Sequence, residues 1–385
     1  MEGENRFLAI IKKSIVHILV AAIASGVTFW FCSPQQGTKL DEVRNLIDKC
    51  FVGEVDHQAM DEAAASAMVN ALGDRWSYYI PAENFENYQS QMENVSAGLG
   101  VTITKAEEGF EVIKVEKNSG AFAAGIQVGD IITGVNGTAV TEKTIDEVKS
   151  LIATEDGEEV QLQLLRSGKA LTQKVRYGQF DLVVAEGTLL EDGIGLVRIY
   201  NFDSRCADET IAAIEQLRKQ GATALIFDVR NNPGGYKKEM VKVLDYLLPE
   251  GVVFRSEDYT GATSEDKSNA TCLEMPMAVL VNSESYSAAE FFAAALSEYD
   301  WAEVIGTKTC GKGYFQNTYS LSDGSAVGLS VGKYYTPKGV SLAETGGLTP
   351  DVTVEVDDET AYKIYLETLP ASDDPQLQKA IQVLK

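Results

Sequence analysis

The chain has 385 residues, a length typical of two or three domains that each have a hydrophobic core. Hydrophobic residues make up 45% of the chain and charged residues 23%, which is typical of a globular protein and not of a disordered one. The 33 Lys and Arg against 57 Asp and Glu give a formal net charge of −24, which argues against nucleic-acid binding by a basic face.

Histidine and cysteine restrict the chemistry further. The chain has two histidines, His17 and His57, and the first lies inside an apolar run. A His-rich zinc site is therefore excluded, and a Ser-His-Asp hydrolase would have to use His57. No C-x-x-C pair occurs among the five cysteines, which are Cys32, Cys50, Cys206, Cys272 and Cys310.

The first long apolar segment predicts a transmembrane anchor at residues 14–32, where SIVHILVAAIASGVTFWF is long enough to cross most of a bilayer. Residues 1–13 carry Arg6, Lys12 and Lys13 and are expected to stay in the cytoplasm, which places the rest of the chain outside it. A cleaved signal peptide is the alternative, but the run ends in bulky aromatic residues without a small-x-small site.

Residues 33–93 are expected to be mainly helical. Leu40, Val43, Leu46 and Ile47 are spaced for one apolar helix face, and an alanine-rich run leads to a helix end at Gly73. These helices are expected to pack or dimerise, so a homodimer and a monomer both remain open. We expect His57 to lie in a surface loop between them.

Residues 94–178 change to short alternating strands with glycine turns, which predicts a compact β module with one helix at residues 144–153. Its first strand follows Gly98-Leu99-Gly100-Val101. Two glycines let neighbouring backbone N–H groups converge, and such a loop suits the capture of a peptide carboxylate.

Residues 179–357 alternate strands and helices, as an α/β domain does. The buried run ALIFDV breaks at Arg230-Asn231-Asn232-Pro233-Gly234-Gly235, where the paired glycines allow another backbone or a substrate to approach closely. A simple strand-to-helix turn is the other interpretation of this segment. Residues 358–385 are predicted to form a helical tail.

A second junction joins the buried strand at residues 277–281 to an alanine-rich helix through Ser287. Ser287 and Glu290 fit the S-x-x-E capping box, so Ser287 is either a helix cap or an exposed nucleophile beside helix N–H groups. No histidine stands near to act as its base. Lys312, flanked by Gly311 and Gly313, can serve as a base only if burial lowers its pKa.

A phosphate-binding loop is a rival interpretation of residues 306–313, GTKTCGKG, which nearly match G-x-x-x-x-G-K-[ST]. Gly313 lacks the hydroxyl that would bind Mg²⁺, and the LIFD strand precedes this loop instead of following it. Both departures argue against ATP binding.

The motifs together resemble the C-terminal processing peptidases, also called tail-specific proteases. In the β module the resemblance is to a PDZ domain and is carried by GLGV and GAFAAGIQVGDIITGVNGTAV. In the α/β domain it is carried by IGLVRIYNF, LIFDVRNNPGG, VNSESYSAAEFFAAAL, IGTKTCGKGYFQ and GLTPDV. With LGDRWSYYI and DPQLQKAIQVLK, the similarity spans about residues 39–385.

The resemblance implies roles for individual residues. Ser287 would be the nucleophile, Lys312 its base and Gln316 the glutamine that orients the lysine. The oxyanion hole would use backbone N–H groups of Ala288 and of the Gly234-Gly235 turn. In the PDZ-like module, Gly98, Leu99, Gly100 and Val101 would form the carboxylate loop.

The sequence departs from the family pattern at two places. Residues 285–290 read Ser-Tyr-Ser-Ala-Ala-Glu where the family usually has Ser-Ala-Ser-Ala-Ser-Glu, and Cys310 stands where an aromatic residue is usual. The shape of the site and its substrate subsite are therefore expected to differ from those of relatives.

The expected fold is multidomain α+β, with an anchor, a helical segment, a PDZ-like β-barrel and an α/β catalytic domain with a ClpP/crotonase-like core. The expected function is that of a serine endopeptidase of the bacterial cell membrane that recognises protein or peptide substrates by their C-terminus. No metal or cofactor is implied. An inactive scaffold that binds protein C-termini through the PDZ-like module is the alternative.

Overall fold

The computed structural model describes residues 38–385, and the chain divides into two compact units, residues 1–65 and 66–385. The predicted anchor at residues 14–32 lies outside the described residues. Between residues 38 and 385, no helix combines the length and the apolar character that a membrane span requires.

The described part of the first unit consists of α2 (Lys39–Cys50) and the start of α3 (His57–Asn70). Helix α2 is amphipathic as predicted, but none of its residues is buried. The prediction of a loop at His57 is wrong. Asp56 accepts a hydrogen bond from the Ala59 N–H (3.0 Å), and this cap makes His57 the first, exposed residue of α3.

The β module has a sheet in the order β3-β4-β5-β7-β8, with β3 at its edge, and a separate pair of β2 and β9. The predicted helix is present as α6 (Ile145–Ile152), which Thr144 caps and which buries Val148. The strands and the short helix of the module are β2 (Val95–Gly98), β3 (Val101–Ala106), β4 (Gly109–Val115), α5 (Gly120–Ala123), β5 (Ile131–Val135), β6 (Thr138–Ala139), β7 (Glu159–Arg166), β8 (Lys169–Arg176) and β9 (Gly178–Asp181).

The α/β domain contains a six-stranded sheet in the order β10-β11-β12-β15-β16-β19. All neighbouring strands are parallel except β10 and β11. The strands are β10 (Ala185–Leu189), β11 (Ile194–Ile199), β12 (Ala224–Asp228), β15 (Met277–Val281), β16 (Ala302–Gly306) and β19 (Val352–Thr353). Strands β12 and β15 are buried along their whole length, as their continuous apolar runs require.

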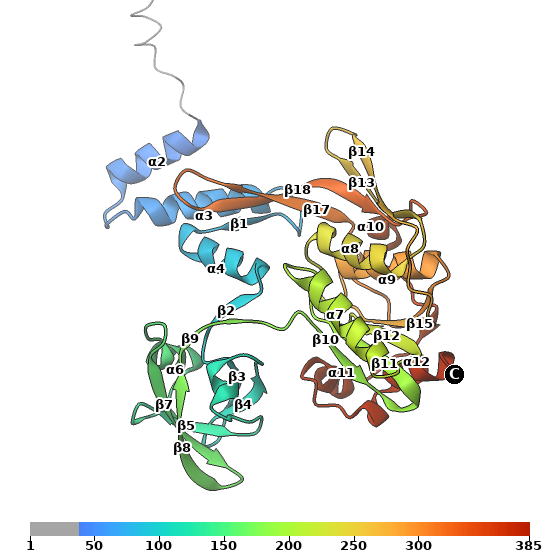
Figure 1. Ribbon diagram of the computed structural model, residues 1–385. Coiled ribbons are helices and arrows are strands. Elements are labelled where there is room, and N and C mark those ends of the chain that lie inside the picture. The colour runs from blue at the N-terminus through green and yellow to red at the C-terminus, as the bar shows by residue number, and fades with distance from the viewer. Residues whose placement is uncertain (1–37) are drawn as a thin grey trace, which may run out of the picture. The chain divides into compact units, whose positions relative to one another are not determined.

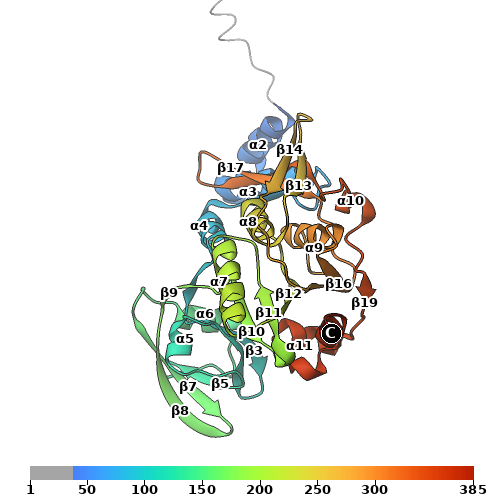
Figure 2. The ribbon, with the colours of Figure 1, turned by 45° about the vertical axis from the view of Figure 1, so that its right-hand side comes forward.

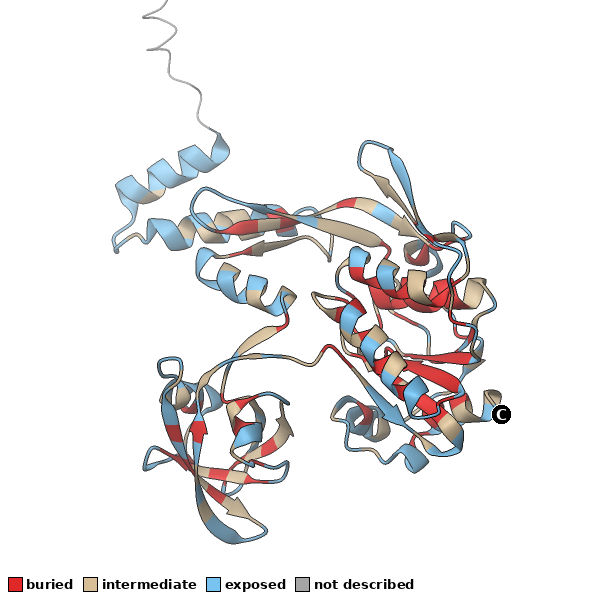
Figure 3. Cartoon of the chain, in the orientation of Figure 1, coloured by how far each residue is buried: buried red, intermediate tan, exposed pale blue. Residues whose placement is uncertain are grey.

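Helices cover both faces of this sheet (Figures 1 and 2). The main core packs α7 (Cys206–Lys219), α8 (Lys237–Leu247) and α9 (Ala288–Glu298) on one face, where Phe227 meets Phe292. The opposite face, which includes Ile226, packs on α12 (Pro375–Val383). Figure 3 shows β12, β15 and α9 as the most continuously buried elements.

A second sheet has the order β1-β18-β13-β14, with β17 also paired to β18. Its strands are β1 (Tyr78–Ile80), β13 (Gly251–Asp258), β14 (Thr263–Ser268), β17 (Tyr314–Ser320) and β18 (Ala326–Tyr335). The remaining elements are α4 (Ala82–Met92), η1 (Glu191–Gly193), α10 (Leu342–Thr345), α11 (Asp358–Tyr365) and η2 (Ala371–Asp373).

The parallel order places three loops together at one edge of the six-stranded sheet. Strands β12, β15 and β16 are neighbours, so the segments that follow their carboxyl ends at residues 229, 282 and 307 emerge side by side. This edge is where open α/β sheets bind ligands. The fold therefore brings Gly234, Ser287 and Lys312 into one region although they are far apart in the sequence.

Candidate active site

Ser287 lies at the sharp turn between β15 and α9. Its backbone has φ 59° and ψ −126°, a conformation that costs a non-glycine residue on the order of 1–3 kcal/mol. Two hydrogen bonds fix the turn to the end of β12: the Ser285 hydroxyl donates to the Val229 carbonyl (2.7 Å), and the Tyr286 N–H donates to the Asn232 carbonyl (3.1 Å). The surrounding structure thus imposes the strained turn that places Ser287 at the sheet edge.

The Gly234-Gly235 turn packs directly on Ser287. A Cβ at Gly234 would lie 2.7 Å from Ser287 Cβ and 2.9 Å from the Ala288 nitrogen, so no other residue fits there. The Gly234 N–H donates to Asn232 Oδ1 (2.8 Å), whereas the N–H groups of Gly235 and Ala288 donate to no described residue. Of the three predicted oxyanion-hole residues, two keep their N–H group available to a bound oxygen atom.

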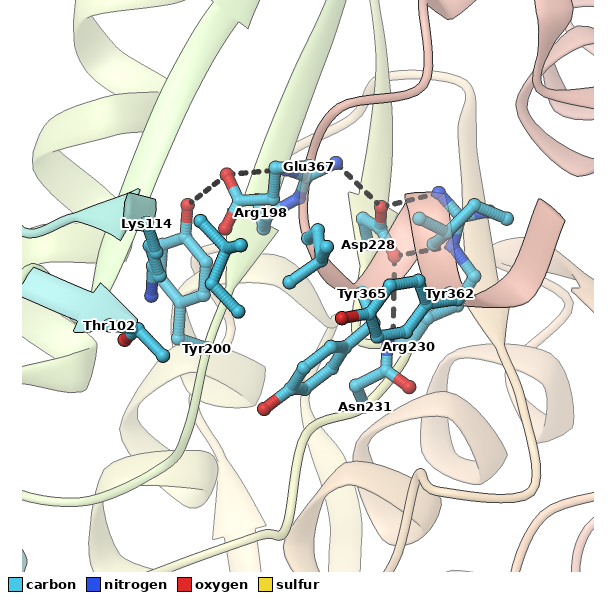
Figure 4. A pocket seen from close by; sticks show the side chains of 13 residues that line it. Thr102, Lys114, Arg198, Tyr200, Asp228, Arg230, Asn231, Tyr362, Tyr365 and Glu367 are labelled. Atoms are coloured by element: carbon cyan, nitrogen blue, oxygen red, sulfur yellow. Dashed lines mark hydrogen bonds and ion pairs between the residues drawn. The ribbon is translucent and has the colours of Figure 1, made fainter. Parts of the chain in front are cut away.

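A buried charge network holds the chain just before this turn (Figure 4). Arg230 donates from Nε to Asp228 Oδ1 (2.9 Å) and from Nη2 to Asp374 Oδ2 (2.8 Å). Arg198 links Asp228 to Glu367, with Nη1 2.8 Å from Glu367 Oε2. Burial by itself raises the pKa of Asp228, but the charge and hydrogen bonds of Arg230 outweigh it and lower this pKa to about 2.

Glu290 connects the serine turn to the lysine loop. Its carboxylate is fully buried and accepts the Ser287 N–H (2.9 Å) and the Lys312 N–H (2.8 Å) on Oε2. Oε1 accepts the Gly311 N–H (2.7 Å) and the Thr309 hydroxyl (2.5 Å). The hydrogen bond from the Ser287 N–H to Glu290 is one half of the predicted capping box. The same carboxylate also binds the backbone of Lys312.

The loop that carries Lys312 leads into a strand, not a helix. It runs from the end of β16 at Gly306 to the start of β17 at Tyr314. A phosphate-binding loop needs the N–H groups of a following helix, so this connection removes the physical basis for phosphate binding.

The Lys312 ammonium lies beside two neighbouring aromatic rings. Nζ is 4.7 Å from the ring centroid of Trp76 and 5.8 Å from that of Tyr286. Burial lowers the pKa of Lys312 below the usual lysine value and outweighs the opposing charges nearby. The groups that raise its pKa are Cys310, Asp74 and Glu290. Arg75 acts in the same direction as burial and lowers it further.

Gln316 lies close in sequence to Lys312 but is bonded elsewhere. It belongs to strand β17, and its Nε2 donates to the Tyr314 carbonyl (3.2 Å) and to Ser330 Oγ (3.0 Å). Among the described residues, Lys312 Nζ makes no hydrogen bond to either Ser287 or Gln316.

One cavity of about 900 Å³ nevertheless collects most of the predicted catalytic groups, and such a volume can hold several residues of an extended peptide. Ser287, Lys312, Gln316, Gly234 and Gly235 all line it. Its aromatic lining comes from Tyr78, Phe85, Tyr88, Tyr236, Tyr286, Phe315 and Tyr334.

Sequence reasoning missed two residues of this site. Trp76 lies 236 positions before Lys312 in the sequence, and nothing in the local pattern of the N-terminal segment indicates that it covers a lysine. Glu290 was interpreted only as a capping residue. The Ser-x-x-Glu spacing predicts the contact of Glu290 with Ser287. Its contact with the Lys312 loop is not predictable from that spacing, because it depends on the pairing of β16 with β15.

The predicted carboxylate loop lies between β2, which ends at Gly98, and the edge strand β3, which begins at Val101. Gly100 has φ +82°, and a Cβ there would collide with the side chain of Ser119. The Leu99 carbonyl accepts the Ala121 N–H (2.8 Å), which ties the loop to the start of α5. The loop and the open edge of β3 together fit the addition of a peptide strand.

Models of two known families match the chain. The model of peptidase family S41 matches residues 193–354, and that of the PDZ domain matches residues 97–176. The match to S41 contains the serine turn, the glycine turn and the lysine loop. The chain belongs to peptidase family S41.

Individual S41 relatives agree with this assignment. A "Probable CtpA-like serine protease" of Staphylococcus aureus (strain COL) is 26% identical over 382 residues, which cover 95% of this chain and 77% of the relative. The protein of the same name from Staphylococcus haemolyticus (strain JCSC1435) is 30% identical over 325 residues, covering 83% and 65%.

Solved structures show the same relationship. The photosystem II D1 C-terminal processing protease is 26% identical, with a TM-score of 0.51, and the match covers 89% of this chain and 93% of that one. A putative S41 protease from Bacteroides fragilis shares the fold at 17% identity and a TM-score of 0.58, over 87% and 92% of the two chains. This S41 chain is therefore a serine-type C-terminal processing protease with a PDZ domain.

The buried network yields a stability prediction. Arg230→Ala leaves Asp228 and Asp374 buried without their main cation, and breaking such a pair costs about 3–5 kcal/mol. Urea unfolding should show a loss of that size in the free energy of unfolding.

Arg218→Ala is the matched control, because Arg218 pairs with Glu215 on the surface at 2.7 Å. It should change the free energy of unfolding by less than about 1 kcal/mol. Equal, small effects of the two substitutions would contradict the structural role assigned to Arg230.

Proposed function

We propose that the chain is a membrane-anchored, extracytoplasmic endopeptidase whose α/β domain, with a ClpP/crotonase-like core, uses Ser287 and Lys312 as a catalytic dyad. Its PDZ domain binds the C-terminus of the protein or peptide to be cleaved. No metal or cofactor takes part in this proposal.

One observation carries the proposal: a single buried carboxylate binds the backbone of both residues of the dyad. Glu290 accepts the N–H of Ser287 and the N–H of Lys312 on the same oxygen, and both side chains line one cavity. Burial lowers the pKa of Lys312, which is the condition for a lysine to act as a base.

In the first step, neutral Lys312 Nζ accepts the hydroxyl proton of Ser287 as Oγ forms a bond to the carbonyl carbon of the substrate. The carbonyl oxygen becomes an oxyanion that the N–H groups of Ala288 and Gly235 stabilise. The Lys312 ammonium then gives its proton to the leaving amine as the C–N bond breaks. The N-terminal part of the substrate remains as an ester on Ser287.

In the second step, Lys312 takes a proton from water as the water oxygen forms a bond to the ester carbon. The C–Oγ bond then breaks, Lys312 returns the proton to Ser287 Oγ, and the new carboxyl end is released. Both steps require Lys312 Nζ to move from the Trp76 ring into hydrogen-bond reach of Ser287 Oγ. Gln316, from the adjoining strand β17, then orients the lysine by accepting a hydrogen bond from Nζ on its amide oxygen, while its Nε2 donates to Tyr314 and Ser330.

The PDZ domain brings the substrate to this site. Backbone N–H groups of the loop at residues 98–101 bind the terminal carboxylate, and the peptide adds as a strand to the edge of β3. Holding the substrate in this way raises its effective concentration at Ser287.

The proposed location is a bacterial cell membrane, with the chain crossing once at residues 14–32. The support is the length of the apolar run and the positive residues before it. Protease treatment of intact spheroplasts should digest residues 33–385 and spare residues 1–13. A chain that is protected in spheroplasts, or that separates from membranes in carbonate, would contradict this topology.

The dyad is tested with the full-length chain in mild detergent and unstructured β-casein as substrate. Ser287→Ala and Lys312→Ala should each lower the cleavage rate by about 10³-fold or more, since each removes a group that forms or breaks bonds. Lys308→Ala changes an exposed lysine of the same loop, and should retain the parent rate. Cleavage that persists in Lys312→Ala would contradict the mechanism.

The pH dependence of kcat/KM should rise through the pKa of Lys312, because only the neutral amine accepts the serine proton. Since burial lowers this pKa, the rise should lie below about pH 10.4, the usual lysine value. A rise at or above that pH would show that Lys312 is not desolvated in the working enzyme.

The carboxylate loop is tested by Gly100→Ala and by peptides with a free or amidated C-terminus. The new Cβ would collide with Ser119 and displace the loop, so preference for the free-acid peptide should fall at least about tenfold. Gly168→Ala is the control, because Gly168 also has positive φ (+76°) but has nothing within 4 Å of its Cβ position. An unchanged preference in Gly100→Ala would remove this loop from substrate recognition.

A further inference from the structure

The turn before β1 reaches into the active-site region and presents Trp76 to Lys312. Asp74 holds this turn, accepting the Trp76 N–H on Oδ1 (3.1 Å) and the Ser77 hydroxyl on Oδ2 (2.6 Å). Ser77 Oγ in turn accepts the Ser330 N–H of β18 (3.1 Å). Trp76 is thus fixed to the same sheet that carries Gln316.

Trp76 and Tyr286 form an aromatic cage, here meaning a pair of neighbouring rings against which the lysine ammonium lies. The centroids of Trp76 and Tyr286 are 6.0 Å apart, and Lys312 Nζ lies within 6 Å of both. Arg75 steadies Trp76, with its guanidinium carbon 4.1 Å from the same ring and Nη2 donating to Cys310 Sγ (3.1 Å). No described residue receives a hydrogen bond from Nζ, and the titratable groups that act on it are Cys310, Asp74, Glu290 and Arg75.

Ring faces attract the ammonium and do not attract the neutral amine. The cage therefore stabilises the protonated, resting form of Lys312, while catalysis needs the neutral form at Ser287 Oγ. The two positions compete for one side chain. Tyr286 and Cys310, which contact this arrangement, are two of the three positions where the sequence departs from the family pattern; the third is Ala289.

We propose that Trp76 is a positioning residue that holds protonated Lys312 away from Ser287 and so sets the fraction of enzyme in which the dyad is assembled. This inference rests on the Ser287–Lys312 dyad proposed above. Trp76 touches neither substrate nor the reacting atoms, and it acts through the lysine.

The test compares Trp76→Leu with Trp76→Phe in the full-length chain. Leucine keeps an apolar cover over Lys312 but has no ring face, so the protonated lysine loses its attraction to this position. The rise of kcat/KM should move to lower pH by about 0.5–1.5 units, and kcat below that rise should increase about three- to thirtyfold with little change in KM. Phenylalanine keeps a ring face and should keep the rise within about 0.3 units of the parent.

Equal pH profiles for Trp76→Leu and the parent would overturn the proposal, as would a shift to higher pH, which would indicate that Trp76 only excludes water. Loss of kcat in both variants with an unchanged pH profile would assign Trp76 a purely structural role. If Lys312→Ala cleaves as fast as the parent, the dyad and the role of Trp76 fail together.

A measurement on the resting enzyme does not depend on the activity of the variants. NMR of the chain with ¹³C-methylated lysines should show one methyl signal shifted upfield by the ring currents of Trp76 and Tyr286, assigned by its loss in Lys312→Ala. Trp76→Phe should keep an upfield signal. A parent spectrum without any such signal would overturn the cage even if Trp76→Leu fails to fold.

Discussion

The active-site region depends on one buried group, the carboxylate of Glu290. All four of its close contacts are donors, three backbone N–H groups and one hydroxyl. Only a carboxylate, which accepts hydrogen bonds on both of its oxygens, satisfies all four donors. A glutamine amide would place its own N–H group against at least one of them. A buried polar group left without partners is costly, so the serine turn and the lysine loop cannot separate without exposing Glu290. The relative position of the two loops is therefore fixed even though their reactive side chains are not yet in contact.

The side chain of Lys312 has more freedom than the backbone that carries it. Lysine has a long stem, and its ammonium lies over Trp76 while its backbone N–H is held by Glu290. The strained φ of Ser287 and the Gly234 contact leave the serine little room, so any motion that assembles the dyad falls to Lys312. Ser287 is therefore held rigidly while Lys312 can move, and the folded structure forms without a hydrogen bond between Lys312 Nζ and Ser287 Oγ. In this account, chemistry begins when the lysine loses its proton and leaves the rings.

Local patterns predicted much of this arrangement from the sequence. The apolar runs ALIFD and MAVLV predicted buried strands, which are present as β12 and β15. The glycine turn and the serine turn were predicted to follow them, and both lie at one sheet edge because the two strands are parallel. The cover of Lys312 was not predictable, because Trp76 reaches it through pairing of β1 with β18, a contact between segments about 250 residues apart. The predicted link from Gln316 to Lys312 stays a prediction, since strand pairing directs its amide to Ser330. His57 shows the limit of loop assignment, where one Asp56 cap turned a predicted loop into a helix start.

The most direct test of the Ser287–Lys312 dyad is labelling by a fluorophosphonate, which traps an activated serine as a stable ester. The account predicts that mass mapping places the label on Ser287 alone. It also predicts that the labelling rate follows the same rise with pH as peptide cleavage, and that Lys312→Ala labels at least about 10²-fold more slowly. A label on another serine, or labelling of Ser287 at the parent rate without Lys312, would contradict the claim that these two residues form the catalytic dyad.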